Sequence, residues 1–197
     1  MCRFIETIHI ECGRIYRLDY HIRRMAATMH SVFGKGDAMC LPGLLVPEKY
    51  KERTRCRIEH DDEIRKIEYI PYHIRPVRSL KLVADDEIDY SLKSVDRSSL
   101  DRLFGCRGQA DEILIVKNGL LTDTSIANIA LWDGYRWSTP RIPLLAGTNR
   151  QYLLDNGIIH EADIRADDLG NYSKIRLFNA MIEFGEVELD CRMISFV

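Results

Sequence analysis

One lysine and the polar residues that follow it along the chain are the side chains best suited to chemistry. Lys93 lies in the segment Tyr90–Arg97, and Asp123 comes thirty residues later. Two turns that can bind an anion follow at Ala146–Arg150 and Phe178–Met181. An amine, a carboxylate and two anion-binding turns are what a pyridoxal phosphate (PLP) enzyme needs. The amine forms a Schiff base, the acid meets the ring nitrogen, and the turns hold the phosphate.

Lys93 and Asp123 each have an ordinary structural explanation as well. Lys93 is one of eight lysines, and most lysines are charged and solvated, whereas a Schiff base requires a neutral amine. Its neighbours Leu92 and Val95 are compatible with burial. Asp123 follows a hairpin, where an aspartate commonly forms an Asx-turn. The functional alternative is a carboxylate that keeps a pyridine nitrogen protonated, so that the ring accepts electrons from a substrate carbanion.

Two further positions are candidates for binding a phosphate. Arg24 borders the apolar face of the first expected helix, where a guanidinium either binds phosphate with paired hydrogen bonds or extends to the solvent. Gly147-Thr148-Asn149 opens a later helix, and the N–H groups and dipole of a helix start favour an anion. Any helix start of this composition gives the same signal.

The bulk composition fits a protein of one large domain or two small ones. The chain has 197 residues, 46% of them hydrophobic, and a net charge of −2, which gives no case for nucleic acid or membrane as partners. No signal peptide or membrane-spanning run is present, so we expect a cytoplasmic protein. The six cysteines are scattered and the histidines show no ligand spacing, so we expect reduced thiols and no metal site.

Strands outnumber helices in the expected order of elements. Apolar and alternating runs predict strands at Arg3–Glu11, Arg14–Leu18, Thr54–His60, Ile64–Tyr72, Ser79–Ala84, Glu112–Lys117, Leu120–Thr122, Ile129–Trp132, Arg136–Thr139, Ile159–Asp163, Lys174–Phe178 and Glu186–Met193. Helices are predicted at Tyr20–Phe33 with Asp19 as N-cap, after Pro47, at Ser98–Phe104, and from Thr148 as cap to Asn156. Without regular βαβ alternation, the fold class is α+β. Pro71 and Pro76 mark a linker between subdomains at residues 1–75 and 76–197.

Taken in order, these segments resemble the class IV aminotransferase family of PLP enzymes. That family includes branched-chain and D-amino-acid aminotransferases and 4-amino-4-deoxychorismate lyase. The matching pieces are Glu6-Thr7, His21-x-x-Arg24, Lys93 with Asp96-Arg97, Thr122-Asp123 with Asn128, Gly147 with Arg150, and Asn179-Ala180. The resemblance implies a D-amino-acid aminotransferase-like fold (fold type IV). A small N-terminal α/β subdomain would precede a larger β-rich subdomain.

The resemblance also implies a role for each site residue. Lys93 would form the Schiff base and move protons, and Asp123 would meet the ring nitrogen. Phosphate ligands would be Arg24, the backbone of Thr148 and Asn149, and Met181. Arg57 would contact a substrate carboxylate, and the protein would be a homodimer that acts on a small amino compound.

The stretches Lys-Ser-Val-Asp-Arg and Phe-Asn-Ala-Met look closest to the lyase branch. We therefore expect conversion of 4-amino-4-deoxychorismate to 4-aminobenzoate and pyruvate. Transamination of an amino acid on the same scaffold is an open alternative. A third is a catalytically weak relative that binds a phosphorylated ligand without turnover.

Three departures from the family pattern bear on the site. The acid at the ring nitrogen is usually glutamate, and Asp123 is shorter, so the ring must lie closer or a water must bridge. The chain begins almost directly on its first strand, without the leading segment of most members, and we expect a more open substrate pocket. Ile126 occupies a position that is often small, where it would crowd the cofactor.

Overall fold

The computed structural model describes residues 3–35 and 41–195, and these residues form two compact units. Unit 1 contains the residues up to Ile74 together with Leu92–Asp96, and unit 2 contains Arg75–Ser91 and the residues from Arg97 onward. The segment that carries Lys93 therefore folds with the N-terminal unit. The subdomain boundary predicted from the sequence, between residues 75 and 76, places this segment in the C-terminal subdomain.

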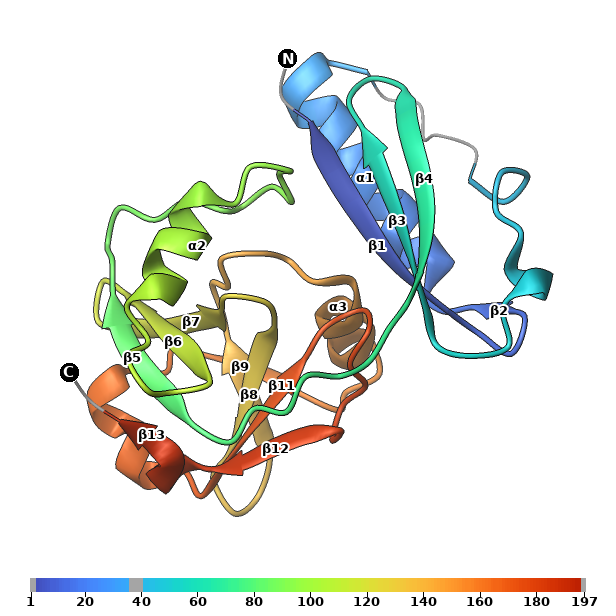
Figure 1. Cartoon of the computed structure of the whole chain (residues 1–197). Helices are drawn as coiled ribbons and strands as arrows, with labels where there is room; N and C mark the ends of the chain where they lie inside the picture. The colour runs from blue at the N-terminus through green and yellow to red at the C-terminus, as the bar shows by residue number, and fades with distance from the viewer. Residues whose placement is uncertain (1–2, 36–40, 196–197) are drawn as a thin grey trace. The chain divides into compact units, whose positions relative to one another are not determined.

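Unit 1 is an antiparallel sheet with one long helix (Figure 1). Its strand order is β2-β1-β3-β4. The elements are β1 (Phe4–Glu11), β2 (Arg14–Ile15), α1 (Leu18–Phe33), the 3-10 turn η1 (Pro47–Lys49), β3 (Thr54–His60) and β4 (Ile64–Pro71). The hairpin predicted between the last two strands is confirmed, whereas the second strand is shorter than predicted.

Helix α1 begins two residues earlier than its sequence signals indicated. Arg17 adopts a left-handed conformation with φ of 53° immediately before the helix, so the strand ends and the helix starts at Leu18. Asp19 is therefore in the first turn and not the N-cap. There its charge still interacts favourably with the helix dipole. Gly34, with φ of 66°, ends the helix and donates its N–H to the carbonyl of His30, a conformation that glycine adopts without steric cost.

The two faces of the unit 1 sheet carry different residues, because side chains alternate along a strand. One face packs against α1, and its core consists of Ile8, Ile10, Met25, Leu41, Leu45, Cys56 and Ile58. The other face carries the intervening residues of β1 and β3, which lie opposite one another in register. We call this second face the back face; it is formed by Ile5, Thr7, His9, Arg55, Arg57 and Glu59.

Lys93 joins unit 1 through backbone pairing with β1. The N–H of Ile5 donates to the carbonyl of Lys93 over 2.9 Å, and Phe4 forms an antiparallel bridge with Ser94. Residues opposed in an antiparallel pair project to the same side of the sheet. The ring of Phe4 contacts Phe33 of α1 at 6.3 Å, so Ser94 is on the α1 side. The neighbouring Lys93 is therefore on the back face.

Unit 2 contains two sheets with strand orders β10-β9-β8-β11-β12 and β13-β5-β6-β7. Its strands are β5 (Leu80–Ala84), β6 (Glu112–Lys117), β7 (Leu120–Thr124), β8 (Asn128–Trp132), β9 (Trp137–Pro140), β10 (His160–Ala162), β11 (Lys174–Phe178), β12 (Val187–Asp190) and β13 (Ile194–Ser195). Its helices are α2 (Ser98–Gly105), α3 (Thr148–Asp155) and the 3-10 turns η2 (Ala166–Asn171) and η3 (Cys191–Met193). The α+β fold class is confirmed.

Local signals in unit 2 predicted the tight turns better than the ends of elements. The Asn118-Gly119 turn between β6 and β7 is confirmed, with φ of 52° and 74° as a type I′ turn requires. The cap of α3 is Gly147 and not Thr148, which occupies the first helical position. The last long strand predicted is wrong beyond Asp190, because the chain there enters the 3-10 turn η3.

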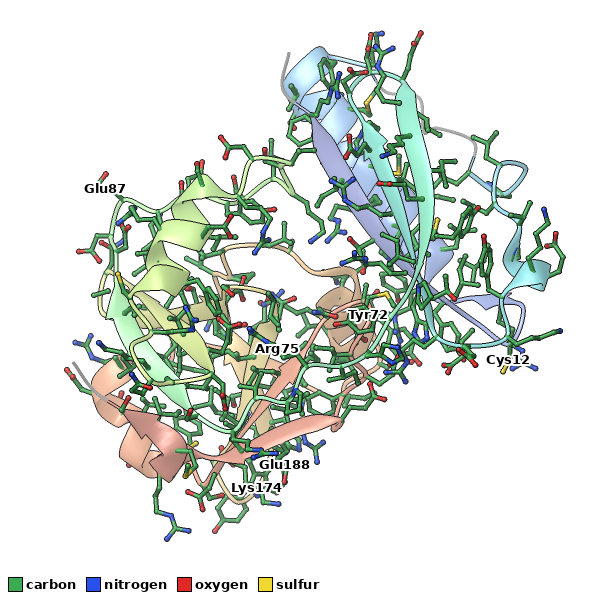
Figure 2. The ribbon with its side chains drawn as sticks, in the orientation of Figure 1. Cys12, Tyr72, Arg75, Glu87, Lys174 and Glu188 are labelled. Carbon is green, nitrogen blue, oxygen red and sulfur yellow. The ribbon has the colours of Figure 1, made fainter. Side chains whose placement is uncertain are left out.

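Ion pairs stabilise unit 2, and three of the residues involved, Arg75, Lys174 and Glu188, are labelled in Figure 2. Arg75 at its start pairs with Glu112 over 2.7 Å, and Lys174 pairs with Glu188 over 2.8 Å across β11 and β12. Glu112 is fully buried, and its carboxylate accepts hydrogen bonds from that arginine and from the N–H of Ile113. Within the described part of the chain, no helix is long and apolar enough to cross a membrane.

Candidate active site

The residues predicted to hold a cofactor are divided between the two units. Unit 1 carries Arg24, Arg57 and Lys93, and unit 2 carries Asp123 and the residues expected to bind phosphate, Thr148, Asn149 and Met181. Each unit therefore contributes its own part of the predicted chemistry, and each part is built by contacts inside its own unit.

In unit 1, Arg24 forms a two-point ion pair with Glu6. Its Nε donates to Oε1 over 2.9 Å and its Nη2 donates to Oε2 over 2.6 Å. His21, one helical turn earlier, approaches Oε2 of the same carboxylate through Nδ1 at 2.5 Å. Glu6 projects from β1 toward α1, so the strand and the helix are joined by this cluster. The bonds to Glu6 use two of the five N–H donors of the guanidinium.

Charge and burial act in opposite directions on this cluster. Burial alone would raise the pKa of Glu6, but the charge of Arg24 and the hydrogen bonds from His21 and Arg24 outweigh it and lower the pKa. Burial lowers the pKa of His21 against the opposing effect of Glu6. Glu6 is therefore an anion, and His21 is neutral and donates its Nδ1 proton. The cluster fixes the orientation of Arg24, which is only 14% exposed.

Arg57 lies on the back face, but acidic neighbours already surround its guanidinium. Its Nη1 contacts a carboxylate oxygen of Glu59 and lies 3.3 Å from Glu68 on β4. The sequence suggested this arginine as a contact for a substrate carboxylate. Two protein carboxylates compete for that role in the structure.

In unit 2, Asp123 is held at both of its oxygens. Nδ2 of Asn128 donates to Oδ1 over 2.9 Å, and the N–H of Leu145 donates to Oδ2 over 2.9 Å. The same Nδ2 also donates to the carbonyl of Leu145 over 2.9 Å. Asp123, Asn128 and the Leu145 peptide thus close a ring of hydrogen bonds. This ring joins the end of β7 to the loop before α3.

Burial makes Asp123 an unusual acid. It is 5% exposed, and burial raises its pKa to about 6, against the hydrogen bonds from Leu145 and Asn128 and the charge of Arg150, which lower it. A raised carboxyl pKa of this kind is characteristic of functional sites. Two hydrogen bonds occupy about half of the acceptor capacity of a carboxylate, so Asp123 can accept a further donor.

Gly147 lies directly against this ring. A Cβ at this position would come within 1.9 Å of Oδ1 of Asn128, a separation that packed atoms do not tolerate. The φ of Gly147 is −69°, so close approach explains the glycine and backbone conformation does not. The lack of a side chain lets the chain pass over Asn128 and start α3 immediately afterwards.

The first turn of α3 is buried and its side chains are engaged. Thr148, Asn149 and Arg150 are at most 4% exposed. Nδ2 of Asn149 donates to the carbonyls of Asn179 and Ile182 over 2.9 and 3.2 Å. Any contribution of Asn149 to an anion site therefore comes from its backbone N–H, as predicted for a helix start.

Met181 belongs to a tight turn that Asn179 organises. Oδ1 of Asn179 accepts hydrogen bonds from the N–H of Met181 over 2.8 Å and of Ile182 over 2.9 Å. The predicted contact of Met181 with phosphate would thus compete with Asn179 for this N–H. Through Asn149, the same turn is fastened to the start of α3.

Four residues with clear structural roles were not among the predicted site residues. They are Glu6, His21, Asn128 and Asn179. All four occur in the motifs that carry the family resemblance. Three of them have apolar neighbours in a buried element: Glu6 lies in β1, His21 lies in α1, and Asn128 begins β8. A polar residue in such a position must find a partner, and this signal could have identified Glu6, His21 and Asn128.

Comparison with known proteins shows which sequences and structures this chain resembles. The sequence pattern of the family Amino-transferase class IV matches residues 96–188 of this chain. An uncharacterized protein of Haemophilus influenzae is 38% identical over 186 residues, which cover 92% of this chain and 98% of that protein. The crystal structure of a "putative 4-amino-4-deoxychorismate lyase" from Haemophilus somnus superimposes with a TM-score of 0.85 at 33% identity, covering 93% of this chain and 98% of the other.

The PLP-bound form of a hypothetical aminotransferase from Mycobacterium tuberculosis shares the fold. Its TM-score is 0.79 at 16% identity, over 99% of this chain and 84% of that chain. The class IV family depends on PLP, and its members share fold type IV. The extent of these matches and the identity to the Haemophilus chains show that this protein belongs to the class IV aminotransferase family.

Proposed function

We propose that the protein is a PLP-dependent lyase that converts 4-amino-4-deoxychorismate to 4-aminobenzoate and pyruvate. The observation that carries PLP chemistry is the buried Asp123, held at both oxygens and raised in pKa to about 6. The choice of the lyase branch rests on the Haemophilus somnus structure, which this chain covers almost completely. The sequence stretches around Lys93 and Asn179 favour the same branch.

The donor set of the chain suits the separate parts of PLP. A buried carboxyl with spare acceptor capacity suits the pyridinium nitrogen. An arginine and the first turn of a helix suit a phosphate. A primary amine suits the aldehyde. In the proposal, Asp123 therefore holds the ring, Arg24 with the N–H groups of Thr148 and Asn149 holds the phosphate together with Met181, and Lys93 carries the cofactor.

When bound, PLP supplies an electrophilic aldehyde and a ring that accepts electrons. Asp123 keeps the proton on the ring nitrogen, since an ionised carboxylate stabilises that positive charge. Nζ of Lys93 accepts a proton from the carbon that bears the substrate amine. The ion pair with Glu6 keeps Arg24 in one orientation, which lowers the entropy lost when it binds phosphate. Arg57 was predicted to bind a substrate carboxylate, and the proposed assembly is a homodimer.

The proposal is tested first through the cofactor and then through the products. The purified protein, supplied with PLP, is expected to show a visible absorption band that Lys93→Ala abolishes. Incubation with 4-amino-4-deoxychorismate should release equal amounts of pyruvate and 4-aminobenzoate. A band without pyruvate would remove the lyase assignment, whereas no band in the wild type would remove PLP chemistry altogether.

Transamination of an amino acid is the second candidate. It would use the same cofactor residues, and fold neighbours described as aminotransferases favour it. The two candidates differ in what they consume. A transaminase requires an amino donor and a keto acid and shows ping-pong kinetics, whereas the lyase needs one substrate and no acceptor. Activity on a panel of amino and keto acids, without pyruvate from 4-amino-4-deoxychorismate, would favour transamination.

A further inference from the structure

The loop that joins α2 to β6 borders a cavity of about 350 Å³ in unit 2. This volume lies in the range of small-molecule sites, which begins at about 300 Å³. The first residues of unit 2 form the opposite side of the cavity, and its lining includes Arg75, Arg107, Gly108, Gln109 and Asp111. None of the lining residues is assigned to PLP in the proposed function.

Arg107 supplies a positive charge to this cavity. The end of α2 holds its side chain, because Nη1 donates to the carbonyl of Phe104 over 3.2 Å and the guanidinium carbon lies 4.1 Å from the centre of the Phe104 ring. Among residues 3–35 and 41–195, no carboxylate forms an ion pair with Arg107. The bond to Phe104 uses one of the five N–H donors of the guanidinium, so most of its donors remain available to a ligand.

Asp111 supplies a negative charge to the same cavity. Its Oδ2 accepts hydrogen bonds from the N–H of Arg78 over 2.8 Å and from Oγ of Ser79 over 3.5 Å. These bonds fix the carboxylate but do not neutralise it, and within the described part of the chain no basic side chain pairs with Asp111. Oδ1 is therefore able to accept a donor from a ligand.

Arg75 also lines the cavity, but its charge is already matched. Its Nη2 donates to Oε2 of the buried Glu112 over 2.7 Å, and its guanidinium carbon lies 5.3 Å from the centre of the Phe104 ring. The unmatched charges on the cavity are thus one guanidinium and one carboxylate. Arg107 and Asp111 are four residues apart in the sequence and do not pair with each other, so a ligand can bridge them.

The chain between these two residues adds backbone donors. The N–H of Ala110 donates to the carbonyl of Arg107 over 3.1 Å, which closes a turn around Gly108 and Gln109. Gly108 has a φ of 60°, as the first central residue of such a turn requires. The N–H groups of Gly108 and Gln109 donate to no other described residue. Both residues line the cavity, where successive N–H groups can bind an oxyanion next to Arg107.

The two opposite charges determine which kind of ligand fits. A simple anion would pair with Arg107 but would bring its charge close to Asp111, and a simple cation would meet the reverse arrangement. Like charges at short range are unfavourable, whereas a ligand with complementary charges avoids this penalty. We propose that the cavity binds a small zwitterion of the amino-acid type, with its carboxylate on Arg107 and its ammonium group on Asp111.

The probe for this site is N,N-dimethylglycine, a zwitterion whose tertiary amine cannot form a Schiff base with PLP. Isotope-labelled full-length protein is titrated with the probe, and the backbone amide signals are followed by NMR. The signals of Gly108, Gln109 and Ala110 should move, with a Kd on the order of millimolar. Acetate and dimethylammonium each carry only one of the two charges, and each should bind at least about 5-fold more weakly.

Two variants remove the charges one at a time. Arg107→Gln keeps a hydrogen-bond donor, and its affinity for N,N-dimethylglycine should fall to that of dimethylammonium for the wild type. Asp111→Asn keeps an acceptor, and its affinity should fall to that of acetate. The matched controls are Arg102→Gln and Asp101→Asn, which change exposed charges of α2 that do not line the cavity. Both controls should bind the probe like the wild type.

Three results would overturn the proposal. Acetate that binds as tightly as N,N-dimethylglycine would show an anion site and would remove the zwitterion assignment. Amide signals of the cavity that do not move, or full affinity in Arg107→Gln or Asp111→Asn, would remove the site itself. Thermal unfolding shows whether each variant is folded, and the comparison of the three probes on the wild type decides the case if a variant is not.

Discussion

The side-chain amide of Asn128 donates a 2.9 Å hydrogen bond to Oδ1 of Asp123. The same amide nitrogen holds the carbonyl of Leu145, whose N–H holds the other oxygen of Asp123. Asn128 thus determines where the buried acid points and where the loop before α3 begins. In the proposed function these are the positions of the ring-nitrogen acid and of the phosphate site, so one asparagine sets the spacing between them.

Asn128→Leu is expected to lower both stability and cofactor affinity. The substitution keeps a similar volume but leaves Oδ1 of Asp123 and the carbonyl of Leu145 without their donor. Each unsatisfied buried group costs about 1–3 kcal/mol. Chemical denaturation of the apoprotein measures the loss. Asn156→Ala, which removes an exposed side-chain bond to Tyr152, should change the free energy of unfolding by no more than about 0.5 kcal/mol.

Gly147→Ala is expected to damage the same ring from the other side. The new Cβ would lie 1.9 Å from Oδ1 of Asn128, so the loop or the asparagine must move. Overpacking of this kind costs about 1–3 kcal/mol, and weaker PLP binding should accompany it. Gly105→Ala is the control, because nothing lies within 4 Å of its Cβ position. If both variants bind PLP like the wild type, Gly147 has no role in positioning the loop.

The raised pKa of Asp123 predicts a pH dependence of apoprotein stability. The unfolded chain ionises this carboxyl near 3.8, whereas the folded chain does so at about 6. The folded state therefore binds the proton more tightly. The contribution of Asp123 to stability falls as the pH rises from about 4 to 6 and stays low above that range. The difference between these two pKa values corresponds to about 3 kcal/mol.

Asp123→Asn isolates this effect, because it removes the titration and leaves the other acids unchanged. The difference in free energy of unfolding between the variant and the wild type should shift in favour of the variant as the pH rises from 4 to 7. A difference that does not depend on pH would show that Asp123 titrates normally. In the holoprotein, a positively charged ring should suppress the effect.

Glu6→Gln is expected to destabilise unit 1. Removing the carboxylate leaves Arg24 without its charged partner between β1 and α1, and breaking a buried pair in this way costs about 3–5 kcal/mol. Since the pKa of Glu6 is lowered by folding, its stabilisation is present at neutral pH and is lost only as the solution becomes strongly acidic. Asp19→Asn, which breaks an exposed pair and removes a first-turn charge on the same helix, should lower the thermal midpoint far less than Glu6→Gln does.

Local features of the fold were predictable from the sequence. The strand Lys174–Phe178 and the Asn118-Gly119 turn have the predicted bounds, because each depends on residues that are adjacent in the chain. The N-caps predicted at Asp19 and Thr148 were wrong, because each helix begins earlier than its residue types indicated. The conformation of the preceding residue fixes where a helix begins, and the left-handed Arg17 could not be anticipated from residue type, since such a residue rarely adopts it.

Contacts between residues that are far apart along the chain could not be predicted from the sequence. Glu6 and Arg24 were both part of the motifs, but their ion pair depends on the packing of α1 over β1. The segment around Lys93 is separated from the rest of unit 1 by part of unit 2, and only the fold shows that it pairs with Ile5. The competition between Glu59, Glu68 and a ligand for Arg57 likewise depends on the register of β3 and β4.

The most direct test of this account is reductive trapping of the cofactor on the intact protein. Treatment of the PLP-loaded protein with borohydride, followed by proteolysis and mass spectrometry, should place one phosphopyridoxyl group on Lys93. The Lys93→Ala variant should carry no phosphopyridoxyl group. The Lys81→Ala variant, in which another lysine is replaced, should be labelled like the wild type. Label on a different lysine, or label on Lys93→Ala at the level of the wild type, would contradict the central claim.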